Sequence, residues 1–272
     1  MRGSVKQSTA RLISPRASRA VIDVIKFCLL AGIIILGLTI GTERVGYHWQ
    51  WYRVPRYLWV FEEGRWVAGP LLKGLWVTVQ ITAAGMILAL TIGIVTALFR
   101  LSDAVVARAV ARVYLECIRN TPLLVQIFFI YFVIAPVIDM NAFTSAVLAL
   151  SLFEGAYLSE IFRAGIVSIE RGQWEAAYSL GMTQYGAYRH VIIPQAVRRI
   201  LPPLTGQAIS LIKDSALVST IAIYDLTMQG QAIVAETFLT FEIWFTVAAI
   251  YFIMTGTISY LVHRVENRFR TG

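Results

Sequence analysis

The sequence predicts an all-α integral membrane protein with about six transmembrane helices. Hydrophobic residues make up 57% of the 272-residue chain. Charged residues make up 15%, whereas soluble domains contain about 25%. The apolar residues form runs long enough to cross a bilayer core, which takes about 20 residues per helix. Basic residues lie mainly between those runs, as expected of a membrane protein with a defined orientation.

Six apolar runs are candidate spans: 24–41, 71–99, 113–138, 142–167, 200–224 and 241–262. Charges interrupt the fifth run, and segment 103–111 is ambiguous, since it could cap the third helix on the cytoplasmic side. The runs divide the chain into a basic tail 1–23, an N-terminal helix 24–41, an aromatic-rich segment 42–70, a main membrane domain 71–263 with a long loop 168–199, and a tail 264–272.

The Lys and Arg residues predict the orientation. Of the 24 basic residues, 18 fall on the side that holds both termini and loop 168–199. The positive-inside rule therefore places both termini in the cytoplasm and segment 42–70 outside. That segment is rich in Trp and Tyr, for example Trp49, Trp51 and Tyr52. Such rings prefer the membrane–water interface, so we expect an interfacial anchor, formed as a short amphipathic helix, rather than a ligand cage.

Several function classes lack support in the sequence. Basic and aromatic residues are not interleaved on a polar surface, which argues against nucleic-acid binding. Cys28 and Cys117 fall on the cytoplasmic side, where no disulfide is expected, and the three histidines are scattered. There is no Gly-x-x-x-x-Gly-Lys-Ser/Thr loop and no nucleophile motif or paired carboxylates. We therefore expect neither an enzyme nor a chain that binds a cofactor or hydrolyses ATP by itself.

Loop 168–199 contains the most informative motif. It reads Glu175-Ala176-Ala177, three residues, Gly181, and later Ile192-Ile193-Pro194. The two alanines leave a helix face with little bulk, Gly181 suits a left-handed helix stop, and Pro194 is expected to end the following segment. A short helix would then expose Trp174, Tyr178 and Tyr185. A plain helical hairpin between two spans is the alternative, and composition alone does not separate the two.

This spacing resembles the "EAA" loop of ABC importer permeases, in which the loop is a coupling helix that docks on the ATPase subunit. The resemblance gives the coupling role to Glu175, Ala176, Ala177 and Gly181. We add the neighbouring Trp174, which we expect to be exposed.

Three further stretches resemble the polar-amino-acid branch of that family, the histidine, glutamine and glutamate permeases. Residues 119–126 resemble "RGTPLLVQ", with Asn120 in place of Gly. Residues 155–165 resemble "AYxxEIxRxGI", and residues 213–219 resemble "K(D/E/N)SSLxS". The resemblance covers about residues 71–270, and the first 70 residues are more variable in the family.

The resemblance implies a five-helix permease core plus one N-terminal helix in the bacterial inner (plasma) membrane. Two permease subunits, identical or sister chains, would form the pore. A dimer of ATPase subunits would consume ATP with Mg, and a periplasmic binding protein would deliver the amino acid for alternating access. The rival hypothesis is a secondary transporter driven by an ion gradient, with Glu154 and Asp214 relaying protons.

Three charged residues lie near the middle of predicted spans: Glu154 in the fourth, and Lys213 and Asp214 in the fifth. An ionised side chain at bilayer depth costs about 2.5–3.5 kcal/mol on insertion scales, so we expect all three to face the protein interior or a water-filled cavity. Either they contact substrate, or Glu154 or Asp214 pairs with Lys213 as a structural lock.

A zwitterionic amino acid needs an acceptor for its ammonium and a donor for its carboxylate. Glu154 could accept from the ammonium, while Lys213 or a backbone donor near a helix break could bind the carboxylate. The predicted substrate path consists of Asn120, Glu154, Tyr157, Lys213, Asp214 and Ser215.

Overall fold

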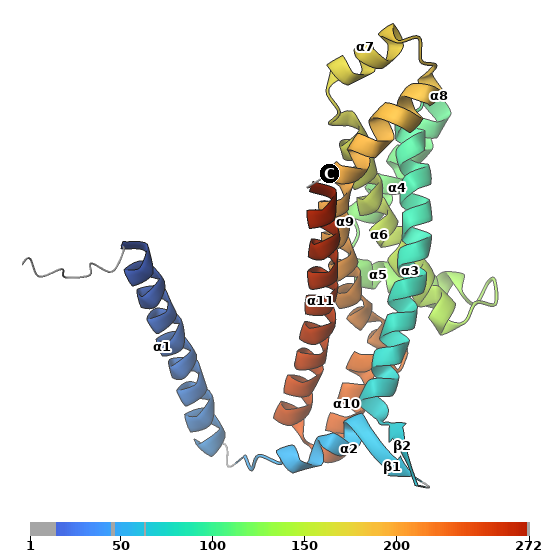
Figure 1. Ribbon diagram of the computed structural model, residues 1–272. Coiled ribbons are helices and arrows are strands. Elements are labelled where there is room, and N and C mark those ends of the chain that lie inside the picture. Colours follow the sequence, from blue (N-terminus) through green and yellow to red (C-terminus); the bar gives the residue numbers. More distant parts are fainter. Residues whose placement is uncertain (1–14, 45–46, 63, 271–272) are drawn as a thin grey trace, which may run out of the picture. The chain divides into compact units, whose positions relative to one another are not determined.

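The computed structural model describes residues 15–44, 47–62 and 64–270, and nearly all of its elements are helices (Figure 1). The chain divides into two units, residues 1–50 and residues 51–272. The first unit contains helix α1 (Pro15–Arg44). Within it, Ile22–Gly41 is long and apolar enough to cross a membrane. Apolar side chains such as Phe27, Leu30 and Ile33 are exposed on successive turns, which suits a helix in lipid.

The second unit begins with a small aromatic region in place of the expected amphipathic helix. It consists of η1 (Trp51–Arg53), α2 (Pro55–Leu58) and an antiparallel hairpin of β1 (Trp59–Glu62) and β2 (Arg65–Ala68). Alternating β-branched and aromatic residues favour this pairing. Phe61 and Trp66 pack edge to face with ring centroids 5.2 Å apart, and most rings stay exposed. The exposed rings still suit an interfacial anchor.

The remaining elements form a helical bundle whose long members are α3 (Pro70–Leu101), α6 (Ala142–Val167), α9 (Ile193–Asp214) and α11 (Thr240–Arg270). Helices α3 and α6 pack closely along their lengths because glycines remove bulk from the contact. A Cβ on Gly93 would lie 2.8 Å from the Cβ of Leu158, and one on Gly155 would lie 2.8 Å from the Ile92 Cγ2.

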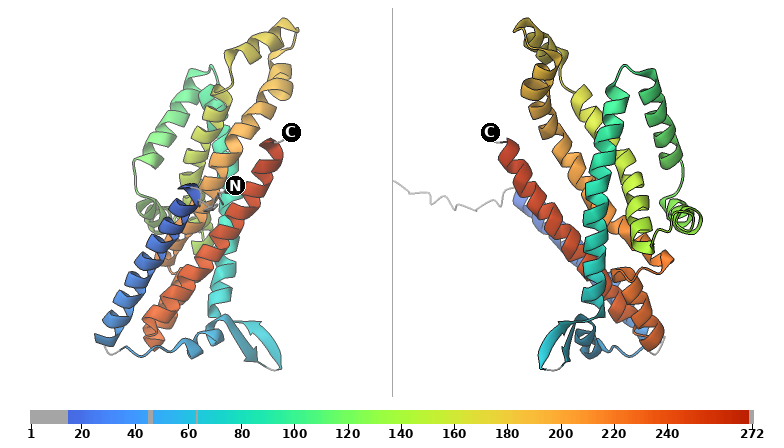
Figure 2. Two further views of the ribbon diagram at one scale, coloured as in Figure 1. Left: turned by 60° about the vertical axis from the view of Figure 1, so that its left-hand side comes forward. Right: turned by 90° about the vertical axis from the view of Figure 1, so that its right-hand side faces the viewer.

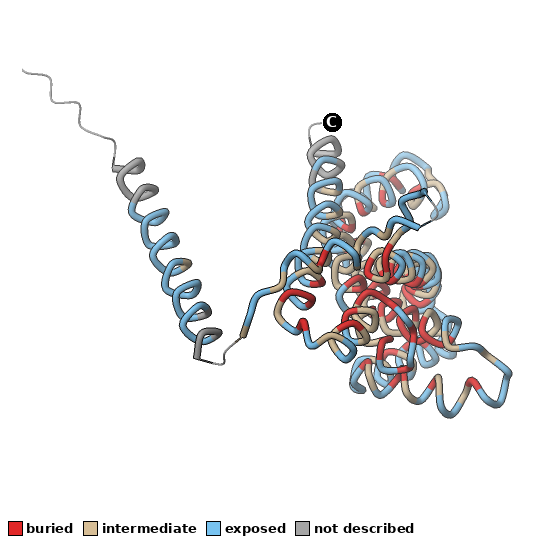
Figure 3. The backbone as a smooth tube through the Cα atoms, turned by 90° about the horizontal axis from the view of Figure 1, so that it is seen from below, coloured by how far each residue is buried: buried red, intermediate tan, exposed pale blue. Residues whose placement is uncertain are grey.

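The main core lies where α3, α5 (Leu123–Phe128), α6 and α9 meet, and its buried side chains include Ile81, Ile127, Leu150 and Leu211. Figure 3 shows the buried residues gathered at the centre of this bundle. A second apolar cluster joins α3 to α10 (Leu226–Thr237) and α11, at the end of the bundle that carries α2 and the hairpin (Figure 1).

The predicted third span, 113–138, is not one straight helix. Helix α4 (Val105–Arg119) ends before Pro122, and α5 continues as the π-helix η2 (Phe129–Ile134) at 106° to it (Figure 2). Proline keeps the residue before it out of the α-helical region, which breaks the run. The buried Gln126 holds the bend, because its Nε2 donates to the Ile118 carbonyl at 2.7 Å and to the Thr121 hydroxyl at 2.8 Å.

The predicted fifth span, 200–224, corresponds to helix α9 (Ile193–Asp214), which begins and ends earlier than predicted. Helix α8 (Gln184–Ala187), the π-helix η3 (Tyr188–Ile192) and α9 follow one another without a break, so Pro194 does not end the segment. Pro194 cannot donate a backbone hydrogen bond within this continuous helix, and the wide π-turn that precedes it accommodates the missing bond. After Asp214 the chain tightens into the 3₁₀-helix η4 (Ser215–Ile221) and turns at Ala222, whose φ is 58°.

Among the described helices, four are long and apolar enough to cross a membrane, and the bent pair of α4 with α5 and η2 would make a fifth. Helix α9 is long but contains Arg198, Arg199 and an internal pair of prolines, and so falls outside that group. The architecture is nevertheless the predicted all-α membrane fold.

Candidate functional site

The predicted coupling motif forms a separate short helix, α7 (Arg171–Ser179), at the end of the bundle opposite the hairpin (Figure 1). Gly181 follows it with φ of 74°. The Gly181 N–H donates to the Tyr178 carbonyl at 2.9 Å, and the Met182 N–H donates to the Ala177 carbonyl at 3.2 Å. These are the two hydrogen bonds typical of a left-handed helix stop, so the predicted role of Gly181 in the fold is confirmed.

Two motif residues face the bundle instead of solvent. Ala177 is 3% exposed, and Trp174 is half-buried with its ring edge-on to Tyr188, the centroids 4.9 Å apart. Trp174 packs on the apolar cluster of Ile169, Ile192, Ala196 and Ile200. The predicted exposure of Trp174 is therefore wrong, because α7 needs one face to attach it to the bundle. Burial raises the pKa of the Tyr188 hydroxyl, with smaller contributions from Tyr178 and Asp103.

The opposite face of α7 is exposed on this chain. Glu175, Ala176 and Tyr178 are exposed there, followed by Leu180, which is 78% exposed. The later Tyr185 is also exposed, as predicted. Glu175 pairs with Arg171 at 3.0 Å, but both side chains are largely in solvent, so the pair adds little stability.

Glu154 lies inside the bundle, as predicted. Its side chain is fully buried on α6, and its Oε2 accepts a hydrogen bond from Nε2 of Gln207 on α9 at 2.5 Å. Its other oxygen has no hydrogen-bond partner among the described residues. Sequence reasoning missed Gln207, whose only signal was its position on the fifth predicted span. A buried carboxylate with one free acceptor is able to bind a cationic group.

Lys213 does not face the interior of this chain, since its side chain is exposed. Leu211, Ile212 and Ser215 occupy the buried face of the same turn, and the helical rotation directs Lys213 outward. Asp214 is half-buried, and the Ser215 hydroxyl donates to the Ile212 carbonyl at 2.7 Å. Within the described residues Lys213 forms no ion pair, so the structure does not show the predicted lock.

Asn120 and Tyr157 are brought together by the bend after α4. They line a cavity of about 300 Å³ with Glu116 and Arg119, two residues that sequence reasoning missed. The Arg119 guanidinium lies 5.7 Å from the centre of the Tyr157 ring, and Nδ2 of Asn120 donates to Oε2 of Glu116 at 2.7 Å. Glu154, Lys213, Asp214 and Ser215 do not line this cavity, so the predicted path residues form more than one group.

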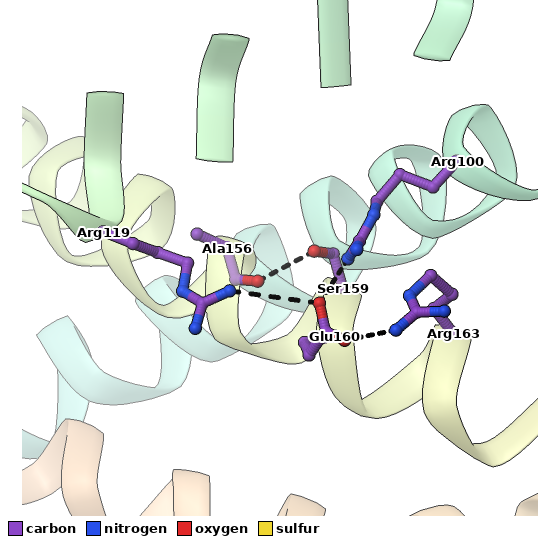
Figure 4. Close-up of polar contacts among 6 residues, drawn as sticks. All are labelled: Arg100, Arg119, Ala156, Ser159, Glu160 and Arg163. Carbon is purple, nitrogen blue, oxygen red and sulfur yellow. Dashed lines mark hydrogen bonds and ion pairs between the residues drawn. The ribbon is translucent and has the colours of Figure 1, made fainter. Parts of the chain in front are cut away.

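Glu160 is the centre of a charge network that the sequence did not assign. Figure 4 shows its carboxylate among three guanidinium groups from three helices. Oε2 accepts from Arg100 of α3 at 2.5 Å and lies 4.0 Å from Arg119 of α4, while Oε1 accepts from Arg163 at 2.6 Å. Glu160 and Arg163 fall within the quoted stretch 155–165. The network ties α3, α4 and α6 together beside the Asn120 cavity.

Comparison with known proteins places this geometry in a family. Residues 66–271 match the model of the binding-protein-dependent transport system inner membrane component. The glutamine transport system permease protein GlnP of Escherichia coli (strain K12) is 40% identical over 209 residues, which are 75% of this chain and 95% of that protein. The L-cystine transport system permease protein TcyB of Bacillus subtilis (strain 168) is 41% identical over 202 residues, which are 73% and 86% of the two chains.

Solved structures agree with the family match. An amino acid ABC transporter crystallised with histidines has a chain of 43% identity that superposes with a TM-score of 0.68, covering 73% of this chain and 94% of that one. The inward-facing MetNI methionine ABC transporter has the same fold at 18% identity, with a TM-score of 0.64 over 74% of this chain and 96% of the other. This chain belongs to the binding-protein-dependent transport inner membrane component family and is the permease subunit of an amino acid ABC importer.

Proposed function

We propose that the chain imports polar amino acids and receives its energy from a separate dimer of ATPase subunits that docks on α7. The observation that carries this proposal is the exposed face of α7, formed by Glu175, Ala176 and Tyr178, on a helix fixed to the bundle by its other face. ATP and Mg are then used by the partner, and the contribution of this chain to ATP use is limited to the docking surface. The relatives named for glutamine and cystine support a polar substrate.

The connection from α7 to the interior supports the same mechanism. The segment α8, η3 and α9 runs from the coupling loop to Gln207 without a break, about 35 Å at 1.5 Å per residue. Near the loop, Nε2 of Gln195 donates to Oε1 of Gln173 at 3.0 Å, and Arg199 donates to the Ser168 carbonyl. Displacement of α7 by the ATPase would therefore move α9, and with it Gln207, whose side chain donates a hydrogen bond to Glu154 of α6.

The substrate path is proposed to include Glu154 as the ammonium acceptor, because its second carboxylate oxygen is buried and has no hydrogen-bond partner among the described residues. Asn120 and Tyr157 would contact the amino acid in their own cavity, where Arg119 could bind a carboxylate. The path would continue to Asp214 and Ser215 at the end of α9, where the α-helix tightens into the 3₁₀-helix η4.

The exposed Lys213 supports a pore made of two permease subunits. A charged side chain at bilayer depth is costly in lipid, so a second copy or a sister chain would cover it or enclose it in a water-filled pore. A periplasmic binding protein would deliver the amino acid to that pore. The chain would lie in the bacterial inner membrane with both termini and α7 in the cytoplasm.

Co-purification of the tagged permease tests the proposal against the secondary-transporter hypothesis. We expect two ATPase chains to co-purify. We also expect proteoliposomes that contain the complex, supplied with the binding protein, to accumulate amino acid only when ATP and Mg are present on the side of the membrane where the ATPase subunits lie. Uptake driven by an ion gradient without any ATPase chain would refute the coupling proposal. A matched variant, Glu175→Lys, reverses the charge of the exposed face and is expected to reduce ATPase association.

A further inference from the structure

A cavity of about 350 Å³ at the coupling-loop end of the bundle is lined by five arginines, and only Arg119 among them belongs to the proposed amino acid path. The cavity lies between α3, α4 and α6 and is lined by Arg100, Arg108, Arg112, Arg119 and Arg163 together with Glu116 and Leu115. Its volume is within the range of small-ligand sites.

The charges around this arginine cavity do not balance. Glu160 shares its two oxygens among Arg100, Arg163 and the more distant Arg119, and Glu116 is engaged by Asn120. Two carboxylates therefore face five guanidinium groups, which leaves an excess of three positive charges. Such a concentration of like charge is costly unless an anion or water reduces it.

Unused hydrogen-bond donors are also present in the arginine cavity. The Arg163 Nε is buried and has no acceptor among the described residues. Arg112 forms no hydrogen bond or ion pair within the described part of the chain, and Arg108 uses one nitrogen on the Ser102 carbonyl at 2.9 Å. Planar guanidinium groups donate in pairs to the oxygens of phosphate, which makes this arrangement suited to a tetrahedral oxyanion.

We propose that the arginine cavity binds a phosphate group, either that of an anionic phospholipid or free inorganic phosphate. Basic pockets between transmembrane helices on the cytoplasmic side bind lipid headgroups. The same helix α4 exposes Val105, Val106, Val110 and Val113 on another face, where acyl chains could lie. This ligand would be a stabilising or regulatory component, and the site goes beyond the proposed amino acid path.

The test uses the purified complex of permease and ATPase subunits in detergent. It is titrated with dioctanoyl phosphatidylglycerol, with inorganic phosphate, and with dioctanoyl phosphatidylcholine as the comparison, whose headgroup carries a phosphate but no net charge. Binding is measured by native mass spectrometry and by the ligand-dependent shift of the thermal unfolding midpoint. Arg112→Gln removes one lining cation that pairs with no other residue in the described part of the chain, and Arg198→Gln removes an exposed cation of α9 that does not line the cavity.

We expect the wild type and Arg198→Gln to bind an anionic probe equally and Arg112→Gln to bind it about tenfold more weakly. Saturable binding of phosphatidylglycerol alone identifies a lipid headgroup as the source, and saturable binding of inorganic phosphate identifies the free ion. Either result supports the site. It is overturned if neither probe binds saturably, if the two variants bind alike, or if the transported amino acid displaces the probe, because the cavity then belongs to the substrate path.

Discussion

Gly181 offers the sharpest test of the coupling helix, because its requirement for glycine comes from the backbone alone. Its φ is 74°, and a Cβ built there would meet no atom within 4 Å. A non-glycine residue in this left-handed conformation costs about 1–2 kcal/mol, which changes a conformational equilibrium by about 5–30-fold. Replacement by valine, which is β-branched, is expected to reach the upper part of that range.

We expect Gly181→Val to leave membrane insertion intact and to weaken ATPase association and substrate-stimulated ATP hydrolysis by about 5–30-fold at limiting ATPase concentration. Gly181→Asn should retain most of the activity, since asparagine adopts this conformation more readily than other residues. Gly172→Val is the matched control: it adds the same side chain to α7, also in open space, at a residue without positive φ. Wild-type coupling in Gly181→Val, or an equal loss in Gly172→Val, would refute the reasoning.

Three further predictions follow from the topology, the packing and the buried carboxylate. Accessibility tags at both chain ends should report the cytoplasm and a tag near Arg56 the periplasm, and a periplasmic N-terminus would contradict the charge-based orientation. Gly165→Ala places a methyl group onto Ile200 and should destabilise the complex by about 1–3 kcal/mol in thermal unfolding, whereas Gly256→Ala, in open space, should not. Glu154→Gln should change substrate affinity or preference in reconstituted transport while assembly and basal ATPase activity persist. An unchanged transport profile would remove Glu154 from the path, and lost assembly would indicate a structural role.

The parts of the fold that depend on local chemistry could be predicted from the sequence. The apolar runs indicated the membrane helices, and the fixed offset of Gly181 indicated the helix stop, because both signals lie within a few residues of the structure they produce. The break at residues 120–122 could also have been found, since proline restricts the residue before it. The long apolar run 113–138 nevertheless favoured a single straight span over a break at the proline.

The features that the sequence did not predict arose where a residue's role depends on distant parts of the chain. Trp174 is half-buried because residues of α9 reach back to form its pocket, which no pattern within the loop reveals. Lys213 is exposed because the phase of α9 is set by Leu211 and Ser215 packing into the bundle. Glu160 was quoted within a family-like stretch, but its three arginine partners became identifiable only when α3, α4 and α6 were placed side by side.

Helix α9 is packed against the bundle at both ends and is weakened between them. This determines how a movement of the coupling loop can be transmitted to the interior of the bundle. At one end Ala196 and Ile200 pack in the cluster below α7, and at the other Leu211 lies in the main core. Between these ends stand Pro202 and Pro203, which cannot donate backbone hydrogen bonds within the helix, and such positions are the usual sites of helix bending. Gln207 lies on the interior side of the prolines. Bending at this pair would therefore change the angle between the end of α9 at α7 and the segment that carries Gln207 and Leu211, so a shift of Gln207 against Glu154 would also move Leu211 in the main core.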